Sequence, residues 1–417
     1  MSKFSNILIL TLSLINLFSC QKAEDELASF LASDSDNSVL YISTGVCNSG
    51  QGMITYTSAT ATRTIESFST SNGASQGQLF DYSSAISGMP ALMSPVSLYN
   101  SGDYLYTLND GGSGQRTLIK IPKSDPYSYT TIIANNSAAF TGRLWSFTID
   151  DEGSFLISKS TGIEKFNSIA SRLTASGSAW INAPAGNCGT ATTSMTSVIT
   201  LPTSSGVTGH VMFAHQGATS ATNRIGIVYG GTGYINTSNC LAGAQISAVT
   251  HTKAPNLASG TVAFNATGTS PSAMVFVPYS SGTVVGKLLV SYSNGQTYNS
   301  VSGTATTLNH GIVAWDVSRS SPSAAALSNP VVLVEDHNKV YAVSAMTYDS
   351  TTSSLYIAVG GSLGSANQSG SGYNIEKYTL DLTNAATTGP TLIRASSAPF
   401  ILGGSNTKCI SGLAIGQ

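Results

Sequence analysis

Short apolar stretches alternate along the chain with stretches rich in Gly, Ser, Thr, Asn and Asp. Beyond residues 1–20, no window holds apolar residues at helical spacing without Gly, Ser or Thr interrupting it. The polar stretches carry the residues that favour turns. The pattern therefore predicts an all-β protein.

The apolar stretches form a loose internal repeat. Residues 355–358 (LYIA) and 375–378 (IEKY) match residues 155–158 (FLIS) and 163–166 (IEKF). Both pairs predict a short strand, a Gly/Ser loop and a second strand that carries the same Glu-Lys pair. Similar short strands are predicted to begin at Leu40, Leu105, Val211 and Leu288.

A further apolar stretch precedes four of these strands, followed by a turn of Ser, Gly, Asp or Pro. These stretches read SPVSLYN before Leu105, LWSFTID before Phe155, SAMVFVP before Leu288 and SAMTYDS before Leu355. Such turns are typical of tight antiparallel connections. Residues 130–134 and 331–334 add fourth strands, so the repeating unit is predicted to contain four strands.

The two ends of the folded region look like halves of one unit. Residues 409–417 resemble a first strand with no second, and the segment from Val39 resembles a second strand with no first. A circular array explains both, because its last strand completes the first sheet and leaves no unpaired edge there. The pattern resembles a β-propeller of six blades closed by pairing of its N- and C-terminal strands. A seventh blade between Val211 and Leu288, a stacked β-sandwich and a β-solenoid remain alternatives.

The N-terminus has the pattern of an export signal. Lys3 precedes an apolar run over residues 7–18, which is too short to span a bilayer as a mature helix. The run ends in Leu17-Phe18-Ser19-Cys20, which resembles the lipobox of bacterial lipoproteins. The alternative is an ordinary signal peptide with an incidental cysteine.

The lipobox resemblance implies a domain organisation and a location. Residues 1–19 would be a signal peptide, and Cys20 would become the lipidated first residue of the mature protein. Residues 20–38 are acidic and Ser-rich, so we expect a flexible tether before a propeller domain over residues 39–417. Gln21 stands where an Asp would favour retention in the inner membrane, so the resemblance implies the outer membrane, facing either the periplasm or the cell surface.

The composition of the chain limits which classes of partner the protein could bind. The chain has 18 Lys and Arg and 20 Asp and Glu, a net charge of −2, and 41% hydrophobic residues. Disordered chains combine low hydrophobicity with high net charge, so we expect a folded core. Nucleic acid requires a basic surface, which argues against a nucleic-acid partner. We expect a monomer.

Four cysteines remain besides Cys20, and an even number in an exported protein predicts two disulfides. In the ring model, Cys47 follows the first predicted strand and Cys409 precedes the last, so we expect these two to pair and to fasten the ring. Cys188 would then pair with Cys240. Free thiols and metal ligation are the alternatives.

No catalytic or metal-binding pattern is present in the sequence. His210 and His215 lie five residues apart on one predicted strand and so face opposite sides. The acidic stretches at residues 109–112 and 150–153 and the group at residues 335–337 are typical of turns, and calcium-loop, phosphate-loop and dinucleotide motifs are lacking. We predict no cofactor, no metal and no catalytic residues.

The loops between second and third strands are predicted to share one face of the ring. They are nearly neutral and rich in Gly, Ser, Asn and Gln. The candidate binding residues in these loops are Asn109, His215, Tyr292, Tyr298 and Tyr373. Aromatic rings among small polar side chains suit recognition of a protein or glycan, although solvated loops of an exported protein have the same composition.

These observations lead to two functional hypotheses. The first is a lipoprotein of the outer membrane whose propeller is a non-enzymatic binding or scaffolding module for an envelope protein or glycan. The alternative is an envelope hydrolase or lyase whose site, at the mouth of the propeller channel, is assembled from several blades.

Overall fold

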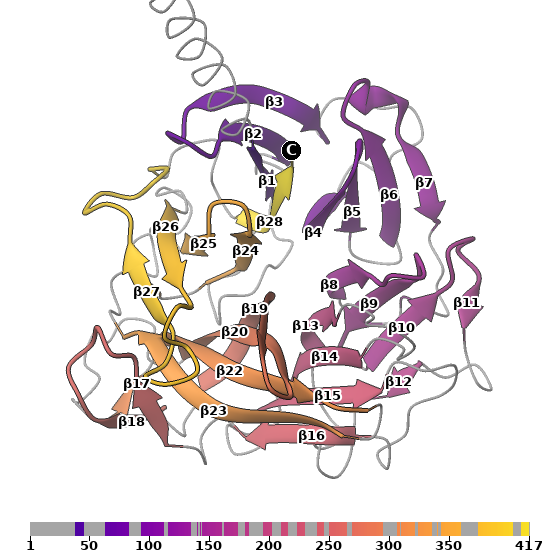
Figure 1. Ribbon diagram of the computed structural model, residues 1–417. Coiled ribbons are helices and arrows are strands. Elements are labelled where there is room, and N and C mark those ends of the chain that lie inside the picture. The colour runs from indigo at the N-terminus through magenta and orange to yellow at the C-terminus, as the bar shows by residue number, and fades with distance from the viewer. Residues whose placement is uncertain are drawn as a thin grey trace, which may run out of the picture.

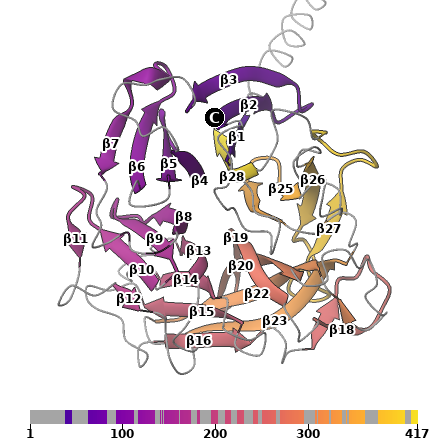
Figure 2. The same ribbon diagram turned by 180° about the vertical axis from the view of Figure 1, so that it is seen from behind.

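The protein is a β-propeller of six blades around a central axis, as the computed structural model shows from both sides (Figures 1 and 2). The structure describes residues 38–45, 63–82, 93–111, 116–134, 140, 142, 144–160, 162–173, 180–182, 195–201, 210–215, 223–229, 240–245, 250–264, 269–294, 307–308, 310–321, 324–335, 340, 343–359, 374–402 and 410–416.

The strands of each blade follow one another from the axis of the ring outward. Blade one consists of β28 (Ile410–Gly416), β1 (Val39–Thr44), β2 (Thr64–Ser69) and β3 (Ser75–Asp81). Blade two consists of β4 (Ser94–Ser101), β5 (Tyr104–Asp110), β6 (Arg116–Pro122) and β7 (Thr130–Ile133). Blade three consists of β8 (Leu144–Ile149), β9 (Phe155–Lys159), β10 (Gly162–Phe166) and β11 (Arg172–Leu173), with β12 (Ile181–Asn182) also paired to β10.

The other three blades follow the same order. Blade four consists of β13 (Met195–Thr200), β14 (His210–His215), β15 (Arg224–Tyr229) and β16 (Cys240–Gln245). Blade five is built on β19 (Thr269–Ser281), β20 (Val284–Asn294), β22 (Gly311–Arg319) and β23 (Ala325–Val334). Blade six consists of β24 (Ala345–Asp349), β25 (Ser354–Val359), β26 (Asn374–Asp381) and β27 (Thr391–Arg394). The all-β prediction and the four-stranded unit are confirmed.

The ring is closed by the two ends of the chain. Strand β28 pairs antiparallel with β1, so that Val39 lies opposite Gly416 and Ile42 opposite Leu413. The C-terminal strand therefore supplies the innermost strand of the first blade, as predicted. In Figure 1 the yellow β28 lies beside the indigo β1.

The alternative of seven blades is wrong. The long interval between Val211 and Leu288 contains β17 (His251–Lys253) and β18 (Thr261–Phe264), which form no blade of their own. Strand β17 pairs parallel with β23, and β18 pairs with β21 (Thr307–Leu308), so these strands widen the outer edge of blade five.

Helical structure is limited to short turns in the described part of the chain. A 3-10 turn, η1 (Pro126–Ser128), connects β6 with β7. Within the described ranges, no helix is both long and apolar enough to cross a membrane.

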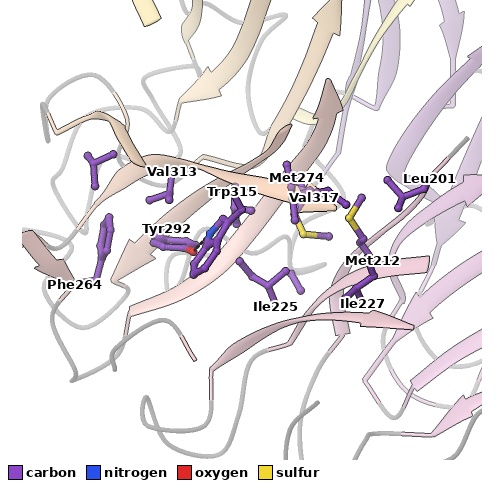
Figure 3. Packing of buried hydrophobic residues seen from close by; sticks show 14 of the residues in the cluster. Leu201, Met212, Ile225, Ile227, Phe264, Met274, Tyr292, Val313, Trp315 and Val317 are labelled. Atoms are coloured by element: carbon purple, nitrogen blue, oxygen red, sulfur yellow. Dashed lines mark hydrogen bonds between the residues drawn. The ribbon is translucent and has the colours of Figure 1, made fainter. Parts of the chain in front are cut away.

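The apolar core lies between neighbouring blades. One cluster joins Met212 and Ile225 of blade four to Met274, Tyr292 and Trp315 of blade five (Figure 3). Each of these side chains is buried, and the same arrangement recurs between other pairs of blades. Burial of apolar area between blades is thus what holds the ring together, at about 25 cal/mol for each Å² removed from water.

Tyr292 corrects one sequence prediction. Its side chain is fully buried, its hydroxyl accepts a hydrogen bond of 2.8 Å from the indole N–H of Trp315, and its ring lies 4.7 Å from that of Phe264. Strand β20 extends to Asn294 and so includes Tyr292, which was predicted to begin a loop. The contacts with Trp315 and Phe264 hold the tyrosine side chain in the core. Tyr292 is a core residue and is not part of a binding loop.

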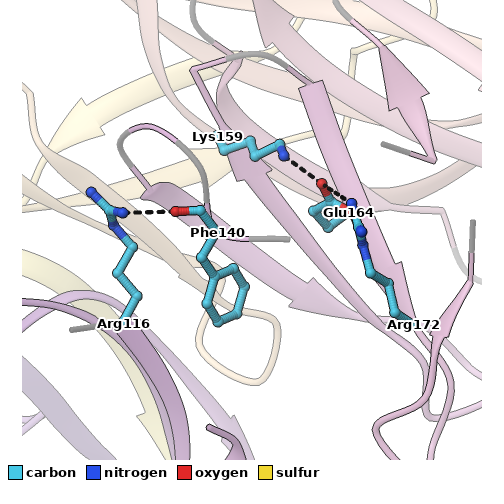
Figure 4. Close-up of polar contacts among 5 residues, drawn as sticks. All are labelled: Arg116, Phe140, Lys159, Glu164 and Arg172. Carbon is cyan, nitrogen blue, oxygen red and sulfur yellow. Dashed lines mark hydrogen bonds and ion pairs between the residues drawn. The ribbon is translucent and has the colours of Figure 1, made fainter. Parts of the chain in front are cut away.

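A buried carboxylate in the third strand of blade three is held by two cations. Glu164 is fully buried, pairs with Lys159, and accepts hydrogen bonds from Arg172 Nε at 2.8 Å and Nη2 at 3.0 Å (Figure 4). Glu376 of blade six accepts an equivalent bond of 2.7 Å from Arg394. In both blades an arginine of the fourth strand thus fastens the outer edge to the third strand.

Candidate functional site: the axial channel

The innermost strands of the six blades surround a cavity of about 230 Å³ on the axis of the ring. Each blade contributes three or four consecutive residues. The lining segments are 96–99 of β4, 145–148 of β8, 196–199 of β13, 272–274 of β19, 344–347 at the start of β24 (residue 344 directly precedes it) and 411–413 of β28. Because all six blades contribute, residues up to 317 positions apart in sequence (413 minus 96) line one cavity.

One register position on the innermost strands carries small residues. A Cβ atom on Gly412 would lie 2.6 Å from the backbone nitrogen of Leu98 in the next blade, which no real side chain tolerates. Register places Ser97, Ser146 and Ser197 at the position of Gly412 in blades two, three and four. Blade six has Ala345 at this position, so the clash at Gly412 is specific to blade one, but small residues recur at this point and each serine adds a hydroxyl to the channel wall.

One serine from every blade lines the cavity. These serines are Ser97, Ser146, Ser197, Ser272, Ser344 and Ser411. In blades one, three and five, the serine is hydrogen-bonded to a serine on the second strand of its own blade. The hydroxyl oxygens lie 2.9 Å apart in Ser411–Ser43, 3.0 Å in Ser146–Ser158 and 2.7 Å in Ser272–Ser291.

The serines of blades two, four and six lack this partner. The second strand carries Leu108, Ala214 and Ala358 where the other three blades have serine. Within the described ranges, no hydrogen bond joins the hydroxyls of these three channel serines to another residue. The Ser344 oxygen is fully covered, whereas Ser197 is 7% exposed and Ser97 is half-buried. The hydroxyls of Ser97 and Ser197 are therefore available to a ligand, whereas that of Ser344 is covered and those of blades one, three and five are bonded within their blades.

Two aromatic side chains, Tyr99 and Trp145, are half-buried in the channel lining. Burial raises the pKa of the Tyr99 phenol, and the carboxylates of Asp151 and Asp150 raise it further, so the phenol is neutral at physiological pH. The lining segments contain no carboxylate, amine, guanidinium or imidazole group. The cavity presents hydroxyls, aromatic rings and aliphatic groups, which suits a neutral ligand with hydrogen-bonding groups.

The described part of the chain holds no group of three or more His, Cys, Asp or Glu side chains with the geometry of a metal site. Asp150 accepts hydrogen bonds from the backbone of Glu152 at 3.1 Å and of Ser154 at 2.7 Å, so residues 150–153 form the predicted turn. Glu335 pairs with Lys253 at 2.8 Å across the extended edge of blade five. These polar groups have structural partners.

Asn109 corrects a second sequence prediction. It lies inside β5, is fully buried, and donates hydrogen bonds to the Thr107 carbonyl at 3.1 Å and the Thr117 hydroxyl at 3.4 Å. The neighbouring Asp110 pairs with Arg116 at 3.0 Å across the hairpin, which carries the strand on to Asp110. Residues 109–110 therefore belong to a strand and not to a binding loop or turn.

The other predicted site residues lie at or beyond the limits of the described ranges. His215 is the last residue of β14, paired with Met195 and Arg224, and so ends a strand instead of lying in the loop. Tyr298 and Tyr373 lie outside the described residues, as do Cys20, Cys47, Cys188 and Cys409, while Cys240 is the first residue of β16. Lipidation and both disulfides stay predictions.

Sequence reasoning missed the channel serines, although a signal was present. Ser272-Ala273-Met274, Ser344-Ala345-Met346 and Ser411-Gly412-Leu413 share one pattern of serine, small residue and large apolar residue. This pattern marks the channel serines of blades five, six and one, whereas Ser97, Ser146 and Ser197 are followed directly by a larger apolar residue and have no such signal.

Known structures resemble this fold at low sequence identity. A protein of unknown function from Bacteroides caccae has a TM-score of 0.43 and 10% identity, with 91% of this chain and 98% of that chain covered. Hydrazine synthase of Kuenenia stuttgartiensis has a TM-score of 0.39 and 9% identity over 76% of this chain and 70% of that one. A chain of a mitotic checkpoint complex has a TM-score of 0.41 and 9% identity over 85% and 78%. Similarities this distant assign no function.

No protein-family model matches the sequence, and a search of curated proteins finds no significant match. The function must therefore be argued from the residues of the channel and the N-terminus.

Proposed function

We propose that the protein is a lipoprotein of the bacterial outer membrane whose propeller binds a neutral envelope component, a glycan or a protein segment, at its axial channel. The single observation that carries the binding role is the channel lining, in which six blades contribute hydroxyls, blades two and three add aromatic rings, and the described lining residues include no charged group. A lining of this kind orients a ligand by hydrogen bonds and contacts its apolar faces.

The ends of the folded chain support the orientation that an anchor would impose. Val39, the first residue of β1, pairs with Gly416 in blade one. In blade two, Leu105 pairs with Asn100 close to the turn between β4 and β5, which is the equivalent end of that blade. The tether would therefore leave the ring at the end where first and second strands are joined. The opposite end of the channel would face away from the membrane.

The tether length is compatible with this arrangement. Residues 21–38 lie between Cys20 and the first strand, and 18 residues extend to at most about 65 Å. Several acyl chains on one cysteine anchor a protein stably, whereas a single chain does not. Cys20 would therefore hold the propeller near the membrane surface with freedom to turn.

The proposal is tested by crosslinking in intact cells, with the wild-type chain compared with Cys20→Ala. The wild-type protein is expected in the outer-membrane fraction, with a crosslinked complex of defined mass, and Cys20→Ala in the soluble fraction without that complex. Retention of Cys20→Ala in membranes at high salt would contradict the anchor. If the wild-type protein gives no complex and a component of an envelope extract is consumed in its presence, the result would favour the enzyme hypothesis instead.

A further inference from the structure

We infer that the axial channel binds a single neutral sugar ring through the hydroxyls of Ser97 and Ser197. This inference rests on the proposed binding function and names the ligand class of the same site. It follows from the size of the cavity, from the hydrogen-bonding state of its serines, and from the charge of its walls.

The volume fits a small ligand. At about 30 Å³ for each water molecule, a cavity of about 230 Å³ has room for roughly eight waters, comparable to one sugar ring with its substituents. The cavity is too small for a folded partner. A macromolecule could place only a short segment in it.

The hydrogen-bonding state of the serines decides where the ligand would bind. Ser146 is fully used, because its hydroxyl is 3.0 Å from that of Ser158 and accepts a hydrogen bond of 2.9 Å from the backbone N–H of Val198 in the next blade. Ser197 occupies the same register position in blade four, but its strand neighbour is Ala214 and its hydroxyl has no partner among the described residues. The Ser197 residue is 7% exposed and its hydroxyl is not fully covered, so this hydroxyl is available for a hydrogen bond with a ligand in the cavity.

Ser97 repeats this arrangement in blade two. Its strand neighbour is Leu108, which offers no hydrogen bond, and Tyr99 lies two residues further along β4 on the same cavity wall. Two hydroxyls with the rings of Tyr99 and Trp145 match a sugar, which presents hydroxyl groups at its edge and C–H groups on its faces.

The charge of the walls excludes the main competing ligand classes. A carboxylate, phosphate or ammonium group in this cavity would lose its hydration without meeting an opposite charge, because the lining segments carry none. A purely apolar ligand would leave the hydroxyls of Ser97 and Ser197 unsatisfied. A neutral polyhydroxyl compound avoids both costs.

The chain offers a matched control for a serine substitution. Ser94 lies three residues before Ser97 on β4, is fully buried, and has a hydroxyl without a hydrogen-bond partner, but it lies outside the cavity lining. Replacing Ser94 or Ser97 by alanine removes the same atom from the same strand. Only the second substitution changes the channel wall.

The experiment uses the otherwise full-length Cys20→Ala protein and measures binding of glucose, galactose and N-acetylglucosamine by titration calorimetry and ligand-observed NMR, with glucuronate as the charged control. At least one neutral sugar is expected to bind and glucuronate to bind more weakly. Ser197→Ala and Ser97→Ala should each weaken binding by about three- to tenfold, the loss of one hydrogen bond, and Ser94→Ala should leave the affinity unchanged.

The inference is overturned if none of the three neutral sugars binds, if glucuronate binds as well as they do, or if Ser94→Ala and Ser197→Ala have equal effects. Its failure is distinguishable from failure of the proposed function. Sugar binding is measured on the detached protein, whereas anchoring and complex formation are measured in cells.

Discussion

The hydroxyl oxygens of Ser43 and Ser411 lie 2.9 Å apart in the folded protein although the two residues are 368 positions apart in sequence. The Ser411 hydroxyl also lies 3.2 Å from the Ser43 carbonyl. This contact joins the N-terminal strand β1 to the C-terminal strand β28, which packs against β4 of blade two and β24 of blade six. The last strand therefore holds three blades together.

Deleting residues 409–417 is expected to destabilise the whole ring. Ile410 is fully buried and Leu413 nearly so, and truncating one such side chain alone costs about 2–5 kcal/mol. Thermal unfolding followed by circular dichroism should show a much lower midpoint, and proteolysis should begin within residues 39–69. Ser411→Ala is the control and should cost only about 1 kcal/mol. A truncated protein that melts like the full-length chain would exclude closure by the terminal strands.

Three glutamates occupy equivalent positions, and substitution by glutamine is expected to have opposite effects on stability at two of them, Glu66 and Glu164. Glu66, Glu164 and Glu376 lie opposite Ile42, Ile157 and Ile357 on the third strands of blades one, three and six. Glu164→Gln removes the buried carboxylate that Lys159 and Arg172 both contact and should lower the free energy of unfolding by about 3 kcal/mol. In blade one, Ser75 occupies the position that Arg172 has in blade three, and the residues beside Ser75 are also neutral. The fourth strand therefore offers Glu66 no cation, and Glu66→Gln should stabilise the protein at pH 7. Urea unfolding of both variants measures the contrast, and equal losses would contradict it.

Glu66 also predicts a pH dependence. Burial raises its pKa, a hydrogen bond from Thr64 opposes the shift, and the charge of Asp81 adds to it. The folded state then binds the proton more tightly than the unfolded chain, so this residue lowers stability as the pH rises from the unfolded-state pKa, about 4.3, through the folded-state pKa. The stability gained by Glu66→Gln over wild type should be present at pH 7 and vanish below pH of about 4. A gain that is constant across this range would refute the assignment.

The disulfide between Cys47 and Cys409 remains the predicted fastening of the ring. Thr44 pairs with Ile410. Cys47 lies three residues after Thr44, and Cys409 lies directly before Ile410. Peptide mapping without reduction should recover these two cysteines in one linked peptide, and reduction should lower stability by at most about 5 kcal/mol. Recovery of Cys47 joined to Cys188 would show that the prediction is wrong.

The sequence was sufficient for the architecture because strand patterns and chain ends are local features. The repeat of LYIA with IEKY, and the incomplete units at Val39 and at residues 409–417, led to six blades and to their closure. The third copy of the Glu-containing motif, residues 65–68 (IESF), has Ser in place of Lys.

Side-chain environment could not be predicted in the same way. From the sequence, Asn109 and Tyr292 were interpreted as loop residues, because polar and aromatic side chains at the end of a strand are common in loops. Their burial depends on Thr117 and Trp315, which lie 8 and 23 residues away in the chain. The channel serines pose the same problem, since the use of each hydroxyl depends on whether the neighbouring strand carries Ser or an apolar residue.

The central claim is that an envelope component binds in the axial channel, and site-specific photo-crosslinking in living cells tests it most directly. A photoreactive amino acid replaces either Thr347, which lines the channel, or Gln76, which is exposed on the outer strand β3. The account predicts a discrete adduct from position 347 that is absent from position 76 and is reduced by Ser197→Ala. Identical adducts from both positions, or no adduct from position 347 in a protein that is folded and membrane-bound, would contradict it.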